Sequence, residues 1–200
     1  MIKLVLAEDQ SLLRGALASL LAMEADFEIL ADRPDGQAAW ADIRRDPPDI
    51  LVTDIEMPGL TGIELAEAIK RDGLKTRTLI VTTYARPGYL RRAMEAGVSG
   101  YLLKDAPATE LADAIRRVAS GERVIAPELA EAAWGEPDPL SETERRLLRL
   151  AESGLDSHAI AGTSGLARGT VRNYLHEAIS KLGASNRIEA ARIAREKGWL

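Results

Sequence analysis

Acidic, hydroxyl and lysine side chains follow four short apolar runs of the chain. Glu8 and Asp9 follow one run, Asp54 follows another, and Thr82 and Lys104 end two more. Clustered carboxylates repel one another unless a cation joins them, and hard oxygen ligands with room for water favour Mg²⁺. A carboxylate held beside Mg²⁺, a lysine and a hydroxyl can attack phosphorus and hold the product. Each residue alone is most simply a surface residue, so the prediction depends on their meeting at one place.

The order of the surrounding elements brings them together. Short apolar runs, typical of buried parallel strands, alternate with segments of helical period. The expected strands are Ile2–Ala7, Phe27–Ala31, Ile50–Thr53, Thr78–Thr82 and Gly100–Leu103. The expected helices are Ser11–Met23, Asp35–Arg45, Thr61–Arg71, Pro87–Ala96 and Pro107–Ser120. Five such repeats predict a doubly wound α/β fold, whose reactive site lies beyond the carboxyl ends of the strands.

The first expected helix has a double row of apolar residues that predicts packing on the sheet. The row consists of Leu12, Leu13, Ala16, Leu17, Leu20 and Leu21.

The pattern changes after residue 121. We predict a first domain over 1–121, a linker over 122–138 and a small all-α domain over 139–200. Within the linker we expect a short helix around Pro127–Ala133. Trp134 in the linker is either docked on a domain or exposed. The expected helices of this last domain are Ser141–Ser153, Ser157–Thr163, Arg168–Leu182 and Arg187–Lys197. Ser141 and Glu144 have the spacing of a capping box.

Composition excludes several classes of protein. The chain has no cysteine, which excludes disulfides, thiolate metal sites and cysteine nucleophiles. No apolar run approaches the ~20 residues of a membrane span, so a cytoplasmic protein without membrane insertion is expected. The net charge is −5, yet residues 139–200 carry ten basic and seven acidic side chains. A basic tail on an acidic protein is weak support for a nucleic-acid-binding module.

Two segments of the chain resemble known families. The first 121 residues resemble the receiver domain of bacterial two-component response regulators, through Glu8-Asp9, Asp54 followed by Ile55-Glu56-Met57-Pro58-Gly59, Thr82, Tyr101 and Lys104. The segment Leu140–Lys197, with Gly-Thr-Val-Arg-Asn-Tyr and Lys-Leu-Gly, resembles the LuxR-type helix-turn-helix. Together these resemble the NarL/FixJ architecture, and within it the DesR group of lipid-desaturase regulators. The resemblance implies a flavodoxin-like receiver with a five-stranded parallel sheet of order 2-1-3-4-5.

The receiver resemblance also implies roles for particular residues. Asp54 would be the phosphoacceptor, and Glu8, Asp9 and Asp54 would hold Mg²⁺ together with the backbone carbonyl of Glu56. The phosphoryl group would pair with Lys104 and accept a hydrogen bond from Thr82. Tyr101 would change rotamer as Thr82 moves inward, although a plain core role for this tyrosine stays open.

The expected helix Arg168–Leu182 would enter the major groove of DNA. Arg172, Asn173 and His176 share one face, and arginine can read guanine while asparagine reads adenine. We expect Arg168, Thr170 and Lys181 to contact phosphates instead. A merely solvated helix face is the alternative. The chain departs from the family at Ser164, where a large apolar residue is usual, and at Ala167, where a serine or threonine caps the helix.

The leading prediction is therefore a transcription factor, not an enzyme, that a sensor histidine kinase phosphorylates. It would dimerise on phosphorylation and bind double-stranded promoter DNA, with RNA polymerase as a further potential partner. One alternative is a phospho-switched interaction module whose DNA binding has weakened. Another is a Mg²⁺-dependent phosphohydrolase, which the continuation of Glu56 directly into Met-Pro-Gly-Leu-Thr-Gly disfavours.

Overall fold

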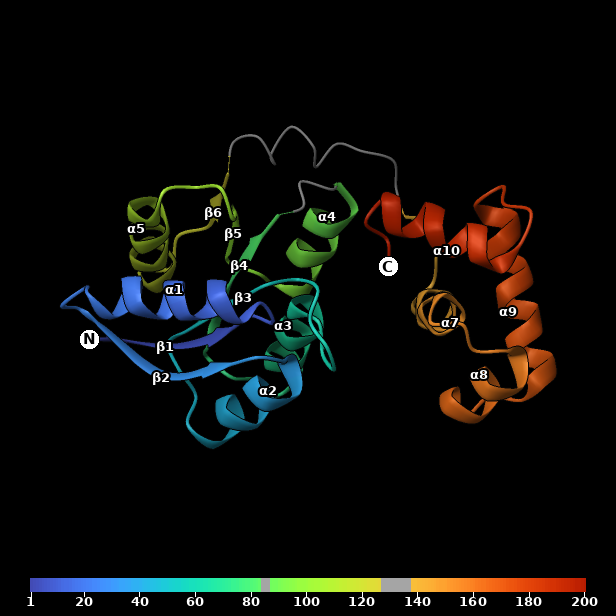
Figure 1. Cartoon of the computed structure of the whole chain (residues 1–200), viewed down its shortest axis with the longest axis horizontal. Helices are drawn as coiled ribbons and strands as arrows, with labels where there is room; N and C mark the ends of the chain where they lie inside the picture. The colour runs from blue at the N-terminus through green and yellow to red at the C-terminus, as the bar shows by residue number, and fades with distance from the viewer. Residues whose placement is uncertain (84–86, 127–137) are drawn as a thin grey trace. The chain divides into compact units, whose positions relative to one another are not determined.

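The computed structural model describes residues 1–83, 87–126 and 138–200. These residues form two compact units (Figure 1). The first holds one β-sheet, the helices α1, α2, α3 and α5, and α4 from Leu90 onwards, and the regular structure of the second is all-helical. Each unit has its own hydrophobic core.

The first unit is built on a parallel sheet with strand order β2-β1-β3-β4-β5-β6. Its strands are β1 (Ile2–Ala7), β2 (Phe27–Arg33), β3 (Ile50–Thr53), β4 (Arg77–Thr82), β5 (Gly100–Leu103) and β6 (Val124–Ile125). The first five have the order that the sequence analysis expects. Four of the helices connect these five strands, α1 (Ser11–Ala22), α2 (Gly36–Arg45), α3 (Gly62–Arg71) and α4 (Pro87–Ala96), and α5 (Ala108–Ala119) leads from β5 to β6.

The sixth strand corrects the expectation of five. β6 lies within the segment predicted to be a linker and pairs with the outer edge of β5. Val124 N–H donates to the carbonyl of Ser99 (2.9 Å) and Ala126 N–H donates to the carbonyl of Tyr101 (3.0 Å). Two residues are too few to show a strand period, which is why the sequence pattern does not reveal this strand.

Helices cover both faces of the sheet. α1 and α5 lie side by side against one face, and α2 and α3 cover the other (Figure 1). On the α2 and α3 side, strand residues Val5, Ala7 and Leu51 pack with Ile43 and Leu65 into one buried cluster. Because side chains alternate along a strand, neighbouring residues such as Leu4 and Leu6, both 1% exposed, belong to the opposite face.

Helix α1 packs on the sheet as predicted, but its two apolar rows are not equally buried. Of its double apolar row, Leu21 is buried, but Leu12 is 87% exposed and Leu20 is 44% exposed. A helix packed on a sheet buries one stripe, and the adjacent row lies about 100° further round its axis. The row that starts at Leu12 therefore remains on the surface.

The second unit consists of four helices around a small core. They are α7 (Glu142–Glu152), α8 (Ser157–Ser164), α9 (Arg168–Lys181) and α10 (Arg187–Glu196). All four contribute fully buried side chains, including Leu147, Ile160, Val171 and Ala190. The predicted capping box is confirmed: the Ser141 hydroxyl accepts from Glu144 N–H, and the Glu144 carboxylate accepts from Ser141 N–H.

The helices α8 and α9 differ in how their N-terminal N–H groups are capped. Asp156 caps α8 by accepting hydrogen bonds from His158 and Ala159 N–H, and α8 ends at Gly165 with φ of 71°. α9 begins after Ala167, which provides no side-chain cap. A serine or threonine there would satisfy one more helix N–H.

The predicted linker helix and Trp134 lie outside the described residues. None of the helices within 1–83, 87–126 and 138–200 has the length and apolar character needed to cross a membrane.

The loop that carries Asp54 depends on a glycine. A Cβ at Gly62 would overlap the backbone carbonyl of Asp54, whereas a Cβ at Gly15 in α1 would meet nothing within 4 Å. We predict that Gly62→Ala lowers the free energy of unfolding by about 1–3 kcal/mol through overpacking. Gly15→Ala, the matched control, should raise it by roughly 0.5–1 kcal/mol. Urea unfolding measures both, and equal stability of the two variants would contradict the steric argument.

Candidate phosphoacceptor and DNA-binding sites

The carboxyl ends of four strands deliver the predicted site residues to one edge of the sheet. Glu8 follows β1, Asp54 follows β3, Thr82 ends β4 and Lys104 follows β5. Backbone hydrogen bonds hold these ends in register, from Asp54 N–H to Ala7 (3.0 Å) and from Lys104 N–H to Thr82 (2.8 Å). The parallel topology thus assembles residues that are up to 96 positions apart in the sequence.

Lys104 lies between two buried carboxylates. Its Nζ is 2.8 Å from Glu8 Oε2 and 2.7 Å from Asp54 Oδ2, and all three side chains are at most 8% exposed. Asp54 Oδ1 accepts a further hydrogen bond from Ile55 N–H (2.6 Å). Burial alone would lower the pKa of Lys104, but the hydrogen bonds to Asp54 and Glu8 raise it. The lysine is therefore held as a cation.

Glu8 shows the opposite balance. Burial raises the pKa of Glu8, and the hydrogen bond from Lys104 offsets only part of that effect. The nearby charge of Asp54 raises the pKa of Glu8 further. Burial is therefore the dominant effect on the Glu8 carboxyl group, and the contact with Lys104 does not fully offset it.

Glu8, Asp9 and Asp54 together fit a divalent cation. Each offers one carboxylate oxygen, and these three oxygens lie within 4.8 Å of one another. Asp9 is exposed, which leaves one side of the cluster open to water. An all-oxygen donor set that keeps several waters suits Mg²⁺. Glu56, whose backbone carbonyl is the expected fourth protein ligand, is half-buried just beyond Asp54.

Thr82 and Tyr101 are completely buried, at 0% exposed. They lie on the adjacent strands β4 and β5, where Thr82 is opposite Leu103 and Tyr101 is opposite Ile80. The structure thus brings Thr82 to the site and places Tyr101 two residues before the end of the neighbouring strand. A core role for Tyr101 and a switch role are both consistent with this position.

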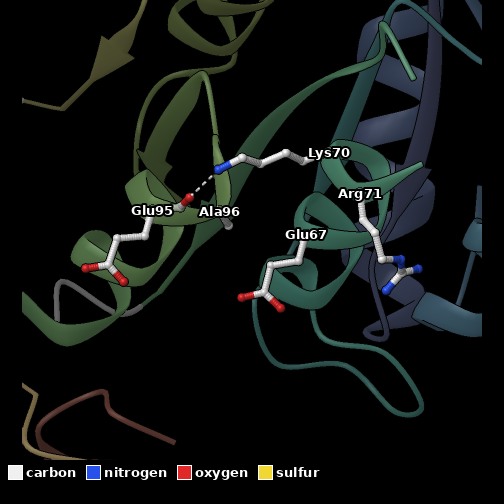
Figure 2. A pocket seen from close by; sticks show the side chains of 5 residues that line it. All are labelled: Glu67, Lys70, Arg71, Glu95 and Ala96. Atoms are coloured by element: carbon white, nitrogen blue, oxygen red, sulfur yellow. Dashed lines mark hydrogen bonds between the residues drawn. The ribbon is translucent and has the colours of Figure 1, made fainter. Parts of the chain in front are cut away.

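A pocket of about 470 Å³ lies away from this edge, between α3 and α4 (Figure 2). Its lining mixes two acidic and two basic side chains with Ala96, and none of the predicted site residues is among them. Lys70 reaches across from α3 and donates to the backbone carbonyl of Glu95 (2.9 Å). This bond satisfies a carbonyl in the last turn of α4, which is a capping role.

In the second unit, α9 presents a polar face opposite its buried one. Val171, Leu175 and Ala178 are buried in the core. The predicted DNA contacts on the other face are all exposed: Arg168, Thr170, Arg172, Asn173 and His176. The exposed side chains on this face of α9 could therefore reach base edges in a major groove.

Lys181, the sixth predicted DNA contact, forms an ion pair within this unit. Its Nζ donates to both carboxylate oxygens of Glu144, each at 2.8 Å, and Glu144 is only 1% exposed. Sequence reasoning identified Glu144 as a helix cap and missed its partner. A signal was present, because Glu144 lies on the same stripe of α7 as Leu147, Leu148 and Ala151, where a charged residue needs compensation.

Two family matches cover these two units. Residues 4–116 match the response regulator receiver domain, and residues 138–194 match the bacterial regulatory proteins of the luxR family. The chain belongs to the two-component response regulators that join a receiver domain to a LuxR-type DNA-binding domain.

Relatives of full length support the same assignment. The chain is 48% identical over 199 residues to the transcriptional regulatory protein DesR of Bacillus subtilis, covering 100% of this chain and 99% of that one. It is 38% identical over 206 residues to the response regulator RamR of Streptomyces coelicolor, covering 100% and 98%. A crystal structure of the response regulator ChrA, from a heme-sensing two-component system, is 35% identical, with coverage of 100% and 98% and a TM-score of 0.58. The resemblance to the DesR group is therefore confirmed.

The cation site can be tested by removing its exposed ligand. Loss of an outer-shell partner alone costs about 10–100-fold in metal affinity, so Asp9→Asn should weaken Mg²⁺ binding by at least about tenfold. Asp32→Asn is the matched control, because Asp32 is an exposed acid near the end of β2. Isothermal titration of each purified protein with MgCl₂ makes the comparison. Equal affinities of the two variants would remove Asp9 from the site.

Proposed function

We propose that this response regulator is switched by phosphorylation of Asp54 and then binds promoter DNA through α9. The observation that carries the proposal is the pair of short contacts from Lys104 to Asp54 and Glu8, beside an open carboxylate cluster. That arrangement supplies a nucleophile, a fixed cation and a place for a metal ion. The phosphodonor would be a phosphohistidine of a sensor kinase, and the protein would act in the cytoplasm.

Each residue has a defined part in the transfer. An Asp54 carboxylate oxygen attacks phosphorus, and the bond from phosphorus to the histidine nitrogen of the donor breaks. Lys104 keeps its charge and moves its hydrogen bond from the carboxylate to a phosphoryl oxygen. Glu8, Asp9, Asp54 and the Glu56 carbonyl would hold Mg²⁺, which would supply positive charge beside the phosphoryl oxygens. We expect no turnover of an exogenous substrate.

The phosphoryl group changes the balance between two conformations. Thr82 can donate a hydrogen bond to a phosphoryl oxygen only when its side chain turns towards Asp54, and Tyr101 then occupies the space released. Since these contacts exist in one conformation only, they shift the population towards it. We infer that this conformation dimerises.

DNA reading belongs to the exposed face of α9. Arg172, Asn173 and His176 would contact base edges, while Arg168 and Thr170 near the start of the helix would contact phosphates. A chain with a net charge of −5 is a weak DNA binder as a monomer. A dimer doubles the contacts and requires two half-sites about one helical turn apart.

Asp54→Asn tests the switch. The variant keeps the side-chain volume but cannot accept a phosphoryl group, so it should stay monomeric when wild type and the Asp32→Asn control dimerise. Light scattering with Mg²⁺, before and after a small-molecule phosphodonor, measures the change, and mass spectrometry locates the phosphate. Phosphate at a residue other than Asp54 would overturn the assignment.

Arg172→Ala tests the DNA contact. It should weaken binding to an operator selected by the phosphorylated wild type by about 1–3 kcal/mol, without changing phosphorylation. Arg44→Ala removes the same charge from an exposed position on α2 and serves as the control. Unchanged operator affinity of the Arg172 variant, measured by fluorescence anisotropy, would exclude this residue from the readout.

A further inference from the structure

An ion pair between a buried carboxylate and a partly exposed lysine joins α7 to the last residue of α9. Glu144 accepts three hydrogen bonds, two from Lys181 Nζ (2.8 Å each) and one from Ser141 N–H (2.6 Å). The Lys181 side chain is 39% exposed, whereas that of Glu144 is 1% exposed. Burial opposes the charged carboxylate, yet the bonds from Lys181 and Ser141 outweigh it and keep the pKa of Glu144 below its usual value. The Glu144 side chain is therefore a carboxylate at neutral pH.

The pair constrains α9 in a way that its apolar contacts cannot. Val171, Leu175 and Ala178 attach the helix to the core through contacts that depend little on direction. The contact of the Lys181 ammonium group with both Glu144 oxygens adds a charged, directional tie between the C-terminal end of α9 and α7. His176 lies five residues from Lys181, about 7.5 Å along the helix at 1.5 Å per residue. A small shift at Lys181 therefore moves the proposed DNA contacts.

We infer that Glu144 and Lys181 are positioning residues for DNA recognition. On this inference, which rests on the proposed reading of DNA by α9, Lys181 acts on the DNA only through the placement of Arg172, Asn173 and His176. The simplest alternative is that Lys181 contacts a DNA phosphate itself. A second alternative is that the pair only stabilises the fold.

These three roles predict different signs for Glu144→Gln. A positioning pair loses its constraint, so specific binding weakens by about threefold or more, within the range of coupling between neighbours. A phosphate-contacting lysine is released from its carboxylate, so binding stays equal or becomes tighter. A purely stabilising pair changes the melting temperature but leaves the affinity of the folded protein unchanged.

The experiment uses the phosphorylated full-length chain and the selected operator at several salt concentrations. Lys181→Met, Glu144→Gln and their double variant should each lose about the same affinity, because either change breaks one shared interaction. The slope of log affinity against log salt should stay as in wild type. Loss of a phosphate contact would instead reduce this slope by about 0.9. Lys181→Arg should retain most of the affinity.

Glu152→Gln is the matched control. Glu152 also lies on α7 and pairs with Arg195 of α10 (2.7 Å), but that pair does not involve α9. It should therefore leave operator affinity unchanged. If a single substitution prevents folding, the double variant Glu144→Met, Lys181→Met is used instead. Removal of both charges leaves no buried charge without a partner. This double variant should also weaken specific binding while the protein remains folded.

A measurement without DNA separates this inference from the proposed function. Amide hydrogen exchange over residues 176–181 should rise in Glu144→Gln and stay as in wild type in Glu152→Gln. Unchanged exchange, a reduced salt slope in Lys181→Met, or undiminished operator binding of Glu144→Gln would each overturn the positioning role. If exchange rises in Glu144→Gln but the wild-type protein binds no operator, the positioning of α9 is supported. Only the proposed reading of DNA is then overturned.

Discussion

The contact on which the first unit depends is that of one lysine with two buried carboxylates. Parallel strands bring Glu8 and Asp54 to the same edge of the sheet, and like charges so close would destabilise the fold if nothing compensated them. Lys104 supplies that compensation from the end of β5, with its backbone N–H bonded to Thr82 of β4. Any change in the charge or partners of Asp54 therefore acts on Lys104. In the proposed switch, this effect would reach the two strands that hold Thr82 and Tyr101.

Much of this fold could be predicted because buried parallel strands are short, continuous apolar runs. β1, β3 and β5 begin and end at the predicted residues, the repeats predicted a doubly wound sheet, and the family resemblance implied its order 2-1-3-4-5. The errors have local causes. β6 is two residues long and takes its stability from the edge of β5, which no local pattern encodes. The row of α1 that includes Leu12 is apolar yet exposed, because a helical period shows which residues share a face and not which face the sheet covers.

The two sites were predictable to different degrees. At the sheet edge, topology alone places Glu8, Asp54, Thr82 and Lys104 near one another, so a coarse prediction of strands is enough. In the second unit the sequence identified basic residues suited to DNA contacts, but it did not reveal which residue each one pairs with in the fold. Lys181, at the end of a basic helix, resembles a phosphate contact, and only the packing of α7 against α9 shows that Glu144 lies beneath it. A charged residue on an apolar stripe is the pattern to look for in such cases.

Both units thus pair a lysine with a buried carboxylate, but the balance of charge differs. At the sheet edge Lys104 contacts the carboxylates of Glu8 and Asp54, and the exposed Asp9 adds a third carboxylate nearby, so the site retains negative charge that a divalent cation can neutralise. In the second unit one carboxylate meets one ammonium group, and Ser141 supplies a further donor, so the charges cancel. In the proposed function, the first pair exchanges partners when a metal ion or a phosphoryl group binds. The second pair has no excess charge to attract either, which suits its proposed role of holding α9 in place.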